Sequence, residues 1–290
     1  MELPHISFEF FPPKSEAGLS HLLDTAEKLA AFNPAYFSVT FGAAGSAQAN
    51  TAETVLAVNK KTGIQTAPHI SCVAADKANI KNLLELYISN NINKLVVLRG
   101  DLPANSISGV ISTDSHFKYA FELIRYIREL SQDHFHISVA CYPEFHPETT
   151  DYKHALFHFK EKVDAGANSA ITQYFYNADA YFKFMESCQK LNIHIPVTPG
   201  IMPITNYEKL MQFSKACGAE IPRWLLYRLE SYKNDLVSIQ SFGEEVVSHL
   251  CEQLIAGGAP GLHFYTLNKP DACIHILNRL SSIIHTDTLL

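Results

Sequence analysis

A single carboxylate near the amino terminus is the residue best placed by its neighbours to do chemistry. Glu9 lies in the run ISFEFFPPK (6–14), among three phenylalanines. Because apolar surroundings disfavour the charged form of an acid, we expect a raised pKa for Glu9 and a carboxyl that donates a proton near neutral pH. Pro12 and Pro13 cannot supply ladder N–H groups, so the strand ends there. Glu9 is therefore predicted at the carboxyl end of a strand, where barrel and open α/β enzymes place their active sites.

Alternation along this strand predicts which side chains share a face. Ser7, Glu9 and Phe11 share one face, which leaves Phe8 and Phe10 to pack against helices. In KLVVLRGD (94–101) an arginine and an aspartate flank Gly100, which permits a ligand to approach the backbone closely.

Polar side chains recur where the predicted strands end, as expected for a barrel whose strand ends line a site. They are Glu9, Thr40, His69, Arg99 with Asp101, Tyr142 with Glu144 and His146, Gln173, and Tyr265 with Asn268. Taken singly, each has a structural explanation: a cap or salt bridge for the glutamate, a mutual pair for the arginine and aspartate, and hydrogen-bonded histidines. Their concurrence at seven strand ends favours a functional site.

These strand ends belong to β-rich runs that alternate with amphipathic helices along the chain. Several runs are almost continuously apolar, which is typical of strands covered on both faces. The predicted strands are 6–11, 36–41, 66–73, 94–100, 137–142, 170–176, 195–199 and 261–266. Helices are expected between them, with Asp76 and Asn206 as N-caps, further helices near 222–232 and 235–256, and a final one from about Asp271. Eight such units predict a single-domain (β/α)8 TIM barrel over residues 1–290, with a doubly wound sheet as the second choice.

Composition limits the class of protein. The chain has 290 residues, 47% hydrophobic and 18% charged, with a net charge of −6, which argues against a nucleic-acid partner. No apolar run approaches the roughly 18–20 residues of a spanning helix, and the first residues do not resemble a signal peptide. Six widely spaced cysteines without a CxxC pair indicate reduced thiols in a cytoplasmic protein.

Several common motifs are absent from the sequence. It has no GxGxxG after a strand, no Walker loop and no GxSxG elbow. His154 and His158 have an i, i+4 spacing that suits a metal, but no HExxH motif accompanies them, and we expect no metal site.

Eight motifs, in order and over nearly the whole chain, resemble those of methylenetetrahydrofolate reductases. They are SFEFFPPK, VTFGA, APHISC, LRGDLP, YPEFHPE, KVDAGANSAITQYFY, PGIMPI and GLHFYTLN. The resemblance implies a (β/α)8 barrel that binds FAD non-covalently. It further implies that NADH or NADPH reduces the flavin, which then reduces 5,10-methylenetetrahydrofolate to 5-methyltetrahydrofolate in ping-pong fashion, a step of one-carbon metabolism that feeds methionine biosynthesis. It leaves the choice of nicotinamide cofactor and a homo-oligomeric state open.

The resemblance also implies roles for individual residues. Glu9 matches the general acid that protonates folate N5, and Asp101 matches an aspartate near both flavin and pterin. The substrate-binding positions are Gln173, Phe213, Tyr265 and Lys269. The FAD-contacting positions are Thr40, Phe41, Ala43, His69, Arg99, Gly100, Asp101, Ala120, Tyr142, His146, His158 and Lys162.

Three positions depart from the family pattern. Ala155 stands where relatives often have an aspartate aimed at the FAD ribose, and Lys209 where one bacterial subgroup has a substrate-contacting glutamine. Lys269 replaces an arginine that helps to hold folate, which keeps the charge but loses the planar fork. Because the chain ends soon after the barrel, we expect no carboxyl-terminal regulatory domain of the eukaryotic kind.

Three alternative functions are consistent with the residues. One is another FAD-dependent barrel oxidoreductase, for example one similar to proline dehydrogenase. A second is a barrel that binds folate or flavin without catalysis, or serves as a partner subunit. A third is a metal-dependent hydrolase, suggested by the fourteen histidines.

Overall fold

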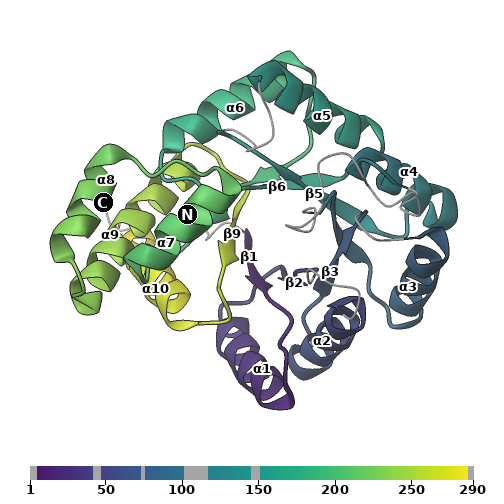
Figure 1. Cartoon of the computed structure of the whole chain (residues 1–290), viewed down its shortest axis with the longest axis horizontal. Coiled ribbons are helices and arrows are strands. Elements are labelled where there is room, and N and C mark those ends of the chain that lie inside the picture. The colour runs from purple at the N-terminus through teal and green to yellow at the C-terminus, as the bar shows by residue number, and fades with distance from the viewer. Residues whose placement is uncertain (1–4, 42–46, 73–75, 101–116, 145–150, 287–290) are drawn as a thin grey trace.

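The computed structural model describes residues 5–41, 47–72, 76–100, 117–144 and 151–286, and in it parallel strands surround a centre with helices outside (Figure 1). The strands are β1 (His5–Phe10), β2 (Tyr36–Val39), β3 (Thr66–Ser71), β4 (Lys94–Leu98), β5 (His136–Cys141), β6 (Ser169–Thr172), β7 (Val197–Thr198), β8 (Gly200–Ile201) and β9 (Gly261–Tyr265). The helices are α1 (Glu16–Ala30), α2 (Ala47–Thr62), α3 (Lys77–Ser89), α4 (Ala120–Ser131), α5 (Tyr152–Asp164), α6 (Ala178–Lys190), α7 (Tyr207–Cys217), α8 (Arg223–Tyr232), α9 (Leu236–Ala256) and α10 (Asp271–Thr286).

The strand order confirms the predicted barrel. It runs β7-β6-β5-β4-β3-β2-β1-β9-β8, and every pairing is parallel. The two ends of this order, β7 and β8, are separated only by Pro199, whose carbonyl accepts a hydrogen bond from the His263 N–H at 3.0 Å. The predicted strand 195–199 therefore corresponds to one strand of the barrel. This strand is interrupted at Pro199, because proline has no N–H to donate to a neighbouring strand. With β7 and β8 counted as one interrupted strand, eight strands form a nearly closed barrel, and the doubly wound alternative is wrong.

Capping side chains begin the helices where the sequence predicts. The Asp76 carboxylate accepts from the Asn79 N–H at 2.7 Å, and the Asn206 side chain accepts from the Lys209 N–H at 2.9 Å. Both predicted caps are confirmed. Each satisfies one of the backbone N–H groups that the first helical turn leaves unpaired.

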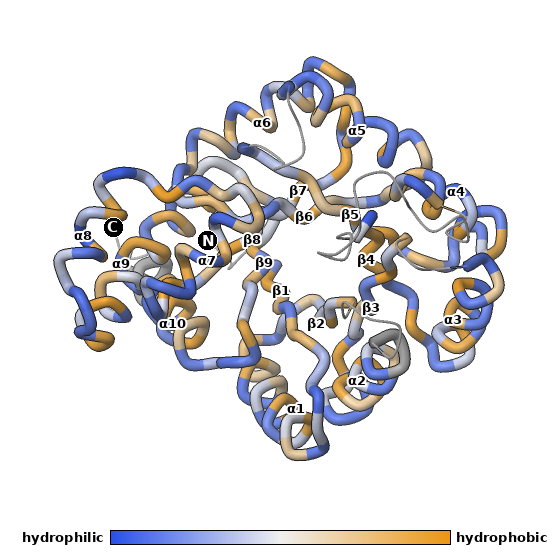
Figure 2. The backbone as a smooth tube through the Cα atoms, in the orientation of Figure 1, coloured by the Kyte–Doolittle hydropathy of each residue, from blue (hydrophilic) through white to orange (hydrophobic). Residues whose placement is uncertain are grey.

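The two faces of the barrel wall differ in chemistry. The outer face packs against the helices in one large apolar core that includes Phe8, Phe10 and Phe264, all fully buried. The helices carry alternating apolar and polar stretches, as an outer ring requires (Figure 2). Inside the barrel, the apolar cluster comprises only three buried residues, Ala67, Val96 and Ile171. Much of the remaining interior is polar, which is unusual for a packed barrel centre.

Three helices lie between β8 and β9, where a regular unit has one. The two predicted helices near 222–232 and 235–256 correspond to α8 and α9, and α7 precedes them. All six cysteines are free thiols. Among the helices of the described ranges, none has the length and apolar character needed to cross a bilayer.

Candidate active site

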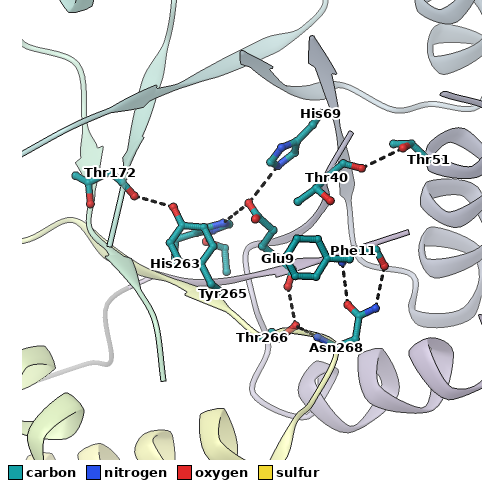
Figure 3. Close-up of polar contacts among 11 residues, drawn as sticks. Glu9, Phe11, Thr40, Thr51, His69, Thr172, His263, Tyr265, Thr266 and Asn268 are labelled. Carbon is teal, nitrogen blue, oxygen red and sulfur yellow. Dashed lines mark hydrogen bonds and ion pairs between the residues drawn. The ribbon is translucent and has the colours of Figure 1, made fainter. Parts of the chain in front are cut away.

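Glu9 lies at the carboxyl end of β1 and points toward the barrel centre between two histidines (Figure 3). Its Oε2 is 3.2 Å from Nε2 of His69 on β3 and 3.4 Å from Nε2 of His263 on β9. The Glu9 side chain is only 12% exposed. Three strands remote in sequence thus bring one carboxylate and two imidazoles together at the predicted site.

The predicted rise in the pKa of Glu9 is wrong, because its pKa is lowered instead. Burial raises the pKa, but the neighbouring charge of His69 and the hydrogen bond from His263 outweigh it and lower the pKa to about 2. The phenylalanines that motivated the expectation lie elsewhere: Phe8 and Phe10 are on the outer face, with rings against Phe37 at 6.1 and 5.3 Å. Glu9 is therefore an ionised carboxylate held by imidazoles.

A hydrogen-bonded chain continues from Glu9 into the barrel, and its central member, His263, is not among the residues predicted from the sequence. His263 is fully buried, and its Nδ1 forms a 2.7 Å hydrogen bond with Ser7 Oγ. Its Nε2 faces Glu9, so Ser7, His263 and Glu9 form one continuous chain. The signal was present in the strand alternation, because His263 shares a face with Tyr265 and Ser7 shares one with Glu9.

His69 completes the cluster from the other side. It is buried, and Nδ1 lacks a hydrogen-bond partner among the described residues. Its Nε2 approaches Glu9 as an ion-pair contact but does not meet hydrogen-bond geometry. Buried polar atoms are normally satisfied, so this imidazole has capacity left for a ligand or water.

Tyr265 joins the site to the broken strand. Its hydroxyl donates to the Thr172 carbonyl at 2.7 Å, and the Gly200 N–H donates to Thr172 Oγ1 at 2.9 Å. A Cβ at Gly200 would lie 2.6 Å from the Tyr265 ring. The glycine after Pro199 therefore makes room for the tyrosine at the edge of the site.

Asn268 has a structural role beside Glu9. Its side chain accepts from the Phe11 N–H at 2.8 Å and donates to the Phe11 carbonyl at 2.9 Å (Figure 3). Thr266 Oγ1 also donates to the Glu9 backbone carbonyl at 2.6 Å. These bonds tie the ends of β1 and β9 together and fix the backbone that carries Glu9.

Lys162, predicted to contact FAD, presents a mostly buried ammonium at the end of β5. It projects from α5 and donates to the Ala140 carbonyl at 2.5 Å. Burial lowers its pKa to about 8. Across the described ranges it forms no ion pair with a carboxylate, so its charge is available to an anionic ligand.

Ala120 and His158, also predicted FAD contacts, come together through Tyr119. The His158 ring stacks on Tyr119 with centroids 5.5 Å apart, and Tyr119 directly precedes α4. His158 Nδ1 is 2.8 Å from Glu161, while His154 meets the His158 ring edge-on at 4.5 Å. No group of three or more potential metal ligands occurs in the part of the chain that the structure describes.

Other predicted FAD contacts line the strand ends on the same side of the barrel. Thr40 follows β2, with its carbonyl accepting from Thr51 Oγ1 at 3.0 Å, and half-buried Phe41 comes next. After β4, the Arg99 carbonyl accepts from Ser71 Oγ at 2.9 Å, and Gly100 has a φ of 84°, a conformation that favours glycine. The predicted residues Ala43, Asp101 and His146 lie outside the described residues.

Gln173 and Tyr142, predicted for substrate and FAD, line one small pocket together with Glu144. The Glu144 carboxylate accepts from the Glu220 N–H at 2.7 Å, and burial raises its pKa to about 7. Gln173 Oε1 accepts from the Tyr174 N–H at 3.0 Å. The pocket thus connects the ends of β5 and β6 with the segment after α7.

The remaining predicted substrate residues stand apart from Glu9. Phe213 on α7 is 40% exposed, and Lys269 after β9 is exposed. Within the described ranges, neither makes a hydrogen bond or ion pair with the Glu9–His69–His263 cluster. Of the departures from the family pattern, Ala155 lies on α5 one turn before His158, and Lys209 lies in the first turn of α7.

Together these features define a class: a parallel (β/α)8 barrel with a carboxylate–imidazole cluster at the carboxyl ends of its strands, suited to proton transfer. Comparison with known proteins makes the assignment specific, because the family model described as methylenetetrahydrofolate reductase matches residues 2–281. The chain belongs to the methylenetetrahydrofolate reductase family.

Individual relatives agree with this assignment. A 5,10-methylenetetrahydrofolate reductase of Buchnera aphidicola subsp. Schizaphis graminum is 39% identical over 93% of this chain and 89% of its own. The enzyme of the same name from Salmonella typhimurium is 33% identical over 95% of this chain and 90% of its own. Methylenetetrahydrofolate reductase (NADH) 1 of Arabidopsis thaliana is 34% identical over 96% of this chain but only 48% of its own.

A solved structure supports the fold. A Clostridium thermocellum protein described as binding two copies of 5-methyl-5,6,7,8-tetrahydrofolic acid superposes with a TM-score of 0.67 over 97% of this chain and 96% of its own, at 16% identity. Family membership supports an oxidoreductase that converts methylenetetrahydrofolate to methyltetrahydrofolate.

Proposed function

We propose that this protein reduces 5,10-methylenetetrahydrofolate to 5-methyltetrahydrofolate with NADH or NADPH through bound FAD, and that Glu9 is the general acid that delivers the proton to the folate. The observation that carries the proposal is the Glu9 carboxylate held between His69 and His263 at the carboxyl ends of the strands. The product keeps its methyl group on N5, so the bond that breaks is the one between the methylene carbon and N10. The proton therefore goes to N10 and not to N5, the ring opens to an iminium at N5, and the methylene carbon then accepts hydride. The same barrel in a protein that binds 5-methyltetrahydrofolic acid is consistent with a folate here.

The residues present fit a dinucleotide cofactor. The Lys162 ammonium has a backbone carbonyl but no carboxylate partner among the described residues, which suits a pyrophosphate. Tyr119 and His158 offer stacked rings near the start of α4, and the Glu161 carboxylate lies 2.8 Å from His158 Nδ1. FAD, when bound, would supply a carrier that takes hydride from the nicotinamide and gives it to the folate. Asp101 stays a predicted neighbour of both.

The source of the proton follows from the cluster. The lowered pKa makes Glu9 a carboxylate at neutral pH, so it acts as a relay rather than as a permanently neutral acid. A proton on either imidazole lies next to Oε2, and Ser7 connects His263 to the barrel interior. A folate covering the mouth would remove the remaining exposure of Glu9, and this added desolvation raises its pKa toward that of a donor. Ligand binding would thus move the proton onto Glu9 when the folate ring is in place.

The test is the visible spectrum of the purified protein under anaerobic conditions. Flavin bands should bleach on addition of NADH or NADPH and return on addition of methylenetetrahydrofolate. Addition of pyrroline-5-carboxylate instead serves as the control for a proline-type oxidoreductase. A protein without flavin bands, or flavin bands that methylenetetrahydrofolate leaves bleached, would contradict the proposal.

A further inference from the structure

One hydrogen bond joins the residues that directly follow two predicted substrate contacts. Gln173 is followed by Tyr174 after β6, and Phe213 is followed by Ser214 on α7. The Tyr174 hydroxyl lies 2.9 Å from Ser214 Oγ, and both side chains are buried. Because each bonded residue is the chain neighbour of a predicted contact, this bond sets the distance between Gln173 and Phe213.

The helix α7 has a narrow buried face. Its buried residues are Leu210 and Ser214, whereas Met211 and Phe213 are 37% and 40% exposed. Successive residues of a helix are about 100° apart around its axis, so Phe213 is turned away from the face that carries Ser214. With little apolar surface to hold it, α7 depends on specific bonds for its position.

A second hydrogen bond fixes the segment that follows α7. The helix is followed by Gly218, whose φ of 75° turns the chain. Two residues further on, the Glu220 N–H donates to the carboxylate of Glu144, beyond the end of β5, at 2.7 Å. Glu144 and Gly218 line the same small pocket as Gln173. The carboxyl-terminal end of α7 is thus held at two points, from β5 and from β6.

The two bonds differ in how ionisation affects them. Burial raises the pKa of Tyr174, so its phenol stays protonated across the working pH range. Burial, with a smaller contribution from the Glu220 charge, raises the pKa of Glu144 to about 7, against the hydrogen bond from the Glu220 N–H. A buried carboxylate is costly, whereas a neutral amide oxygen of the same reach is not. Glutamine in place of Glu144 should therefore keep the bond to Glu220.

We infer that Tyr174 and Glu144 are positioning residues, which hold α7 so that the Phe213 ring stays at a fixed distance from Gln173. The inference rests on the proposed function, because Phe213 and Gln173 are predicted to contact its substrates. Among the described residues, neither Tyr174 nor Glu144 forms a hydrogen bond or ion pair with Glu9. Their loss therefore lowers the fraction of protein in the binding-competent arrangement, and not the rate of proton transfer.

The first measurement is backbone hydrogen exchange by mass spectrometry, on the protein as purified and at pH 8, where Glu144 is a carboxylate. Glu144→Ala should speed exchange in 214–221 by about tenfold or more, because a bond to a charged acceptor is lost, and Tyr174→Phe by about fivefold. Glu144→Gln should exchange like the wild type. Tyr152→Phe is the matched control, because it removes a 3.2 Å bond to Ser187, between α5 and α6.

The second measurement separates binding from chemistry in the reduction of methylenetetrahydrofolate. Glu144→Ala and Tyr174→Phe should each raise the KM for the folate by about threefold or more and leave kcat within about twofold of the wild type. Glu144→Gln should restore the wild-type KM. A general loss of folded protein would instead lower the apparent kcat and leave KM unchanged.

Unchanged exchange in both Glu144→Ala and Tyr174→Phe would overturn the inference, as would a lower kcat at an unchanged KM. If Glu144→Ala does not fold, Tyr174→Phe, which removes a single oxygen atom, decides the question with the same two measurements. A wild-type protein that does not reduce methylenetetrahydrofolate would refute the proposed function, while the exchange rates still decide whether Tyr174 and Glu144 hold α7.

Discussion

Two buried charges at the mouth of the barrel are compensated in different ways. The Glu9 carboxylate has two imidazole partners, which together lower its pKa despite burial. The Lys162 ammonium has the Ala140 carbonyl, and burial lowers its pKa to about 8. An uncompensated buried charge costs stability unless a ligand pairs with it. The buried Lys162 charge therefore lowers the stability of the protein and suits the binding of an anion.

Replacement of Lys162 by methionine tests whether the buried charge lowers the stability of the protein and strengthens the binding of an anion. Because the folded-state pKa is lowered, the ammonium costs stability at pH 7, and the cost falls as pH rises from about 8 toward 10.5. We expect Lys162→Met to stabilise the flavin-free protein at pH 7 by about 2 kcal/mol, with a smaller gain at pH 10, and to weaken FAD binding by roughly tenfold or more. Urea unfolding and FAD fluorescence titration measure the two effects.

Lys160→Met on the same helix is the control, because Lys160 forms an exposed pair with Asp164 at 2.8 Å. It should change stability by less than about 0.5 kcal/mol and leave FAD affinity unchanged. A destabilised Lys162→Met protein that binds FAD normally would contradict the account.

At the scale of single residues, the sequence predicted where a side chain lies in the fold better than it predicted which groups surround that side chain. The prolines after Phe11 located Glu9 at a strand end, but its pKa depended on His69 and His263, which come from remote strands. Alternation turned the adjacent phenylalanines Phe8 and Phe10 away from Glu9. Sequence neighbours of a strand residue occupy the opposite face, so they are poor guides to the surroundings of its side chain.

At the scale of elements, the break between β7 and β8 is the feature that shapes the site. Pro199 ends β7, and Gly200 begins β8 beneath the Tyr265 ring. The alternation of apolar runs with amphipathic helices was enough to predict every strand of the barrel. The break was missed because a proline at the end of a predicted strand looks the same as one inside an interrupted strand.

Gly200→Ala tests the importance of this close approach. A Cβ there would lie 2.3 Å from the Thr172 carbonyl oxygen, which is backbone and cannot move aside cheaply. We expect a loss of about 2–4 kcal/mol in unfolding free energy, from overpacking and a displaced Tyr265. Urea unfolding measures it, and Tyr265→Phe, which removes only the bond to Thr172, should cost about 1 kcal/mol. Equal stability of Gly200→Ala and wild type would contradict this role.

At the scale of the molecule, the large apolar core and the candidate site occupy opposite faces of the barrel wall. The large apolar core lies between strands and helices, whereas the interior holds Ser7, Tyr36, Lys94 and His263 around a small apolar cluster. A polar interior stabilises the fold less than an apolar one, and it carries the proton chain to the mouth. The (β/α)8 architecture was predictable from periodicity, but the polar interior depends on the register between strands, which periodicity alone does not give.

Two adjacent valines on β4 allow a matched comparison of the two faces. Val97 belongs to the outer core and Val96 to the interior cluster, and both are almost fully buried. We expect Val97→Ala to cost about 2–3 kcal/mol and Val96→Ala about 1 kcal/mol, because the outer core provides more apolar contact to lose. Urea unfolding of both variants measures the difference. A larger cost at Val96 would mean that the interior, not the outer shell, dominates stability.

The most direct test of the account is the pair of half-reactions in Glu9→Gln, measured by stopped-flow absorbance of the flavin. Glutamine preserves the shape of the side chain but cannot relay a proton. We expect flavin reduction by NADH or NADPH at nearly the wild-type rate and a loss of about 10²–10⁴-fold in reoxidation by methylenetetrahydrofolate. Glu27→Gln, which alters an exposed carboxylate paired with Lys61, should leave both rates unchanged. Wild-type reoxidation in Glu9→Gln, or an equal loss in both half-reactions, would contradict the role of Glu9 as the proton donor.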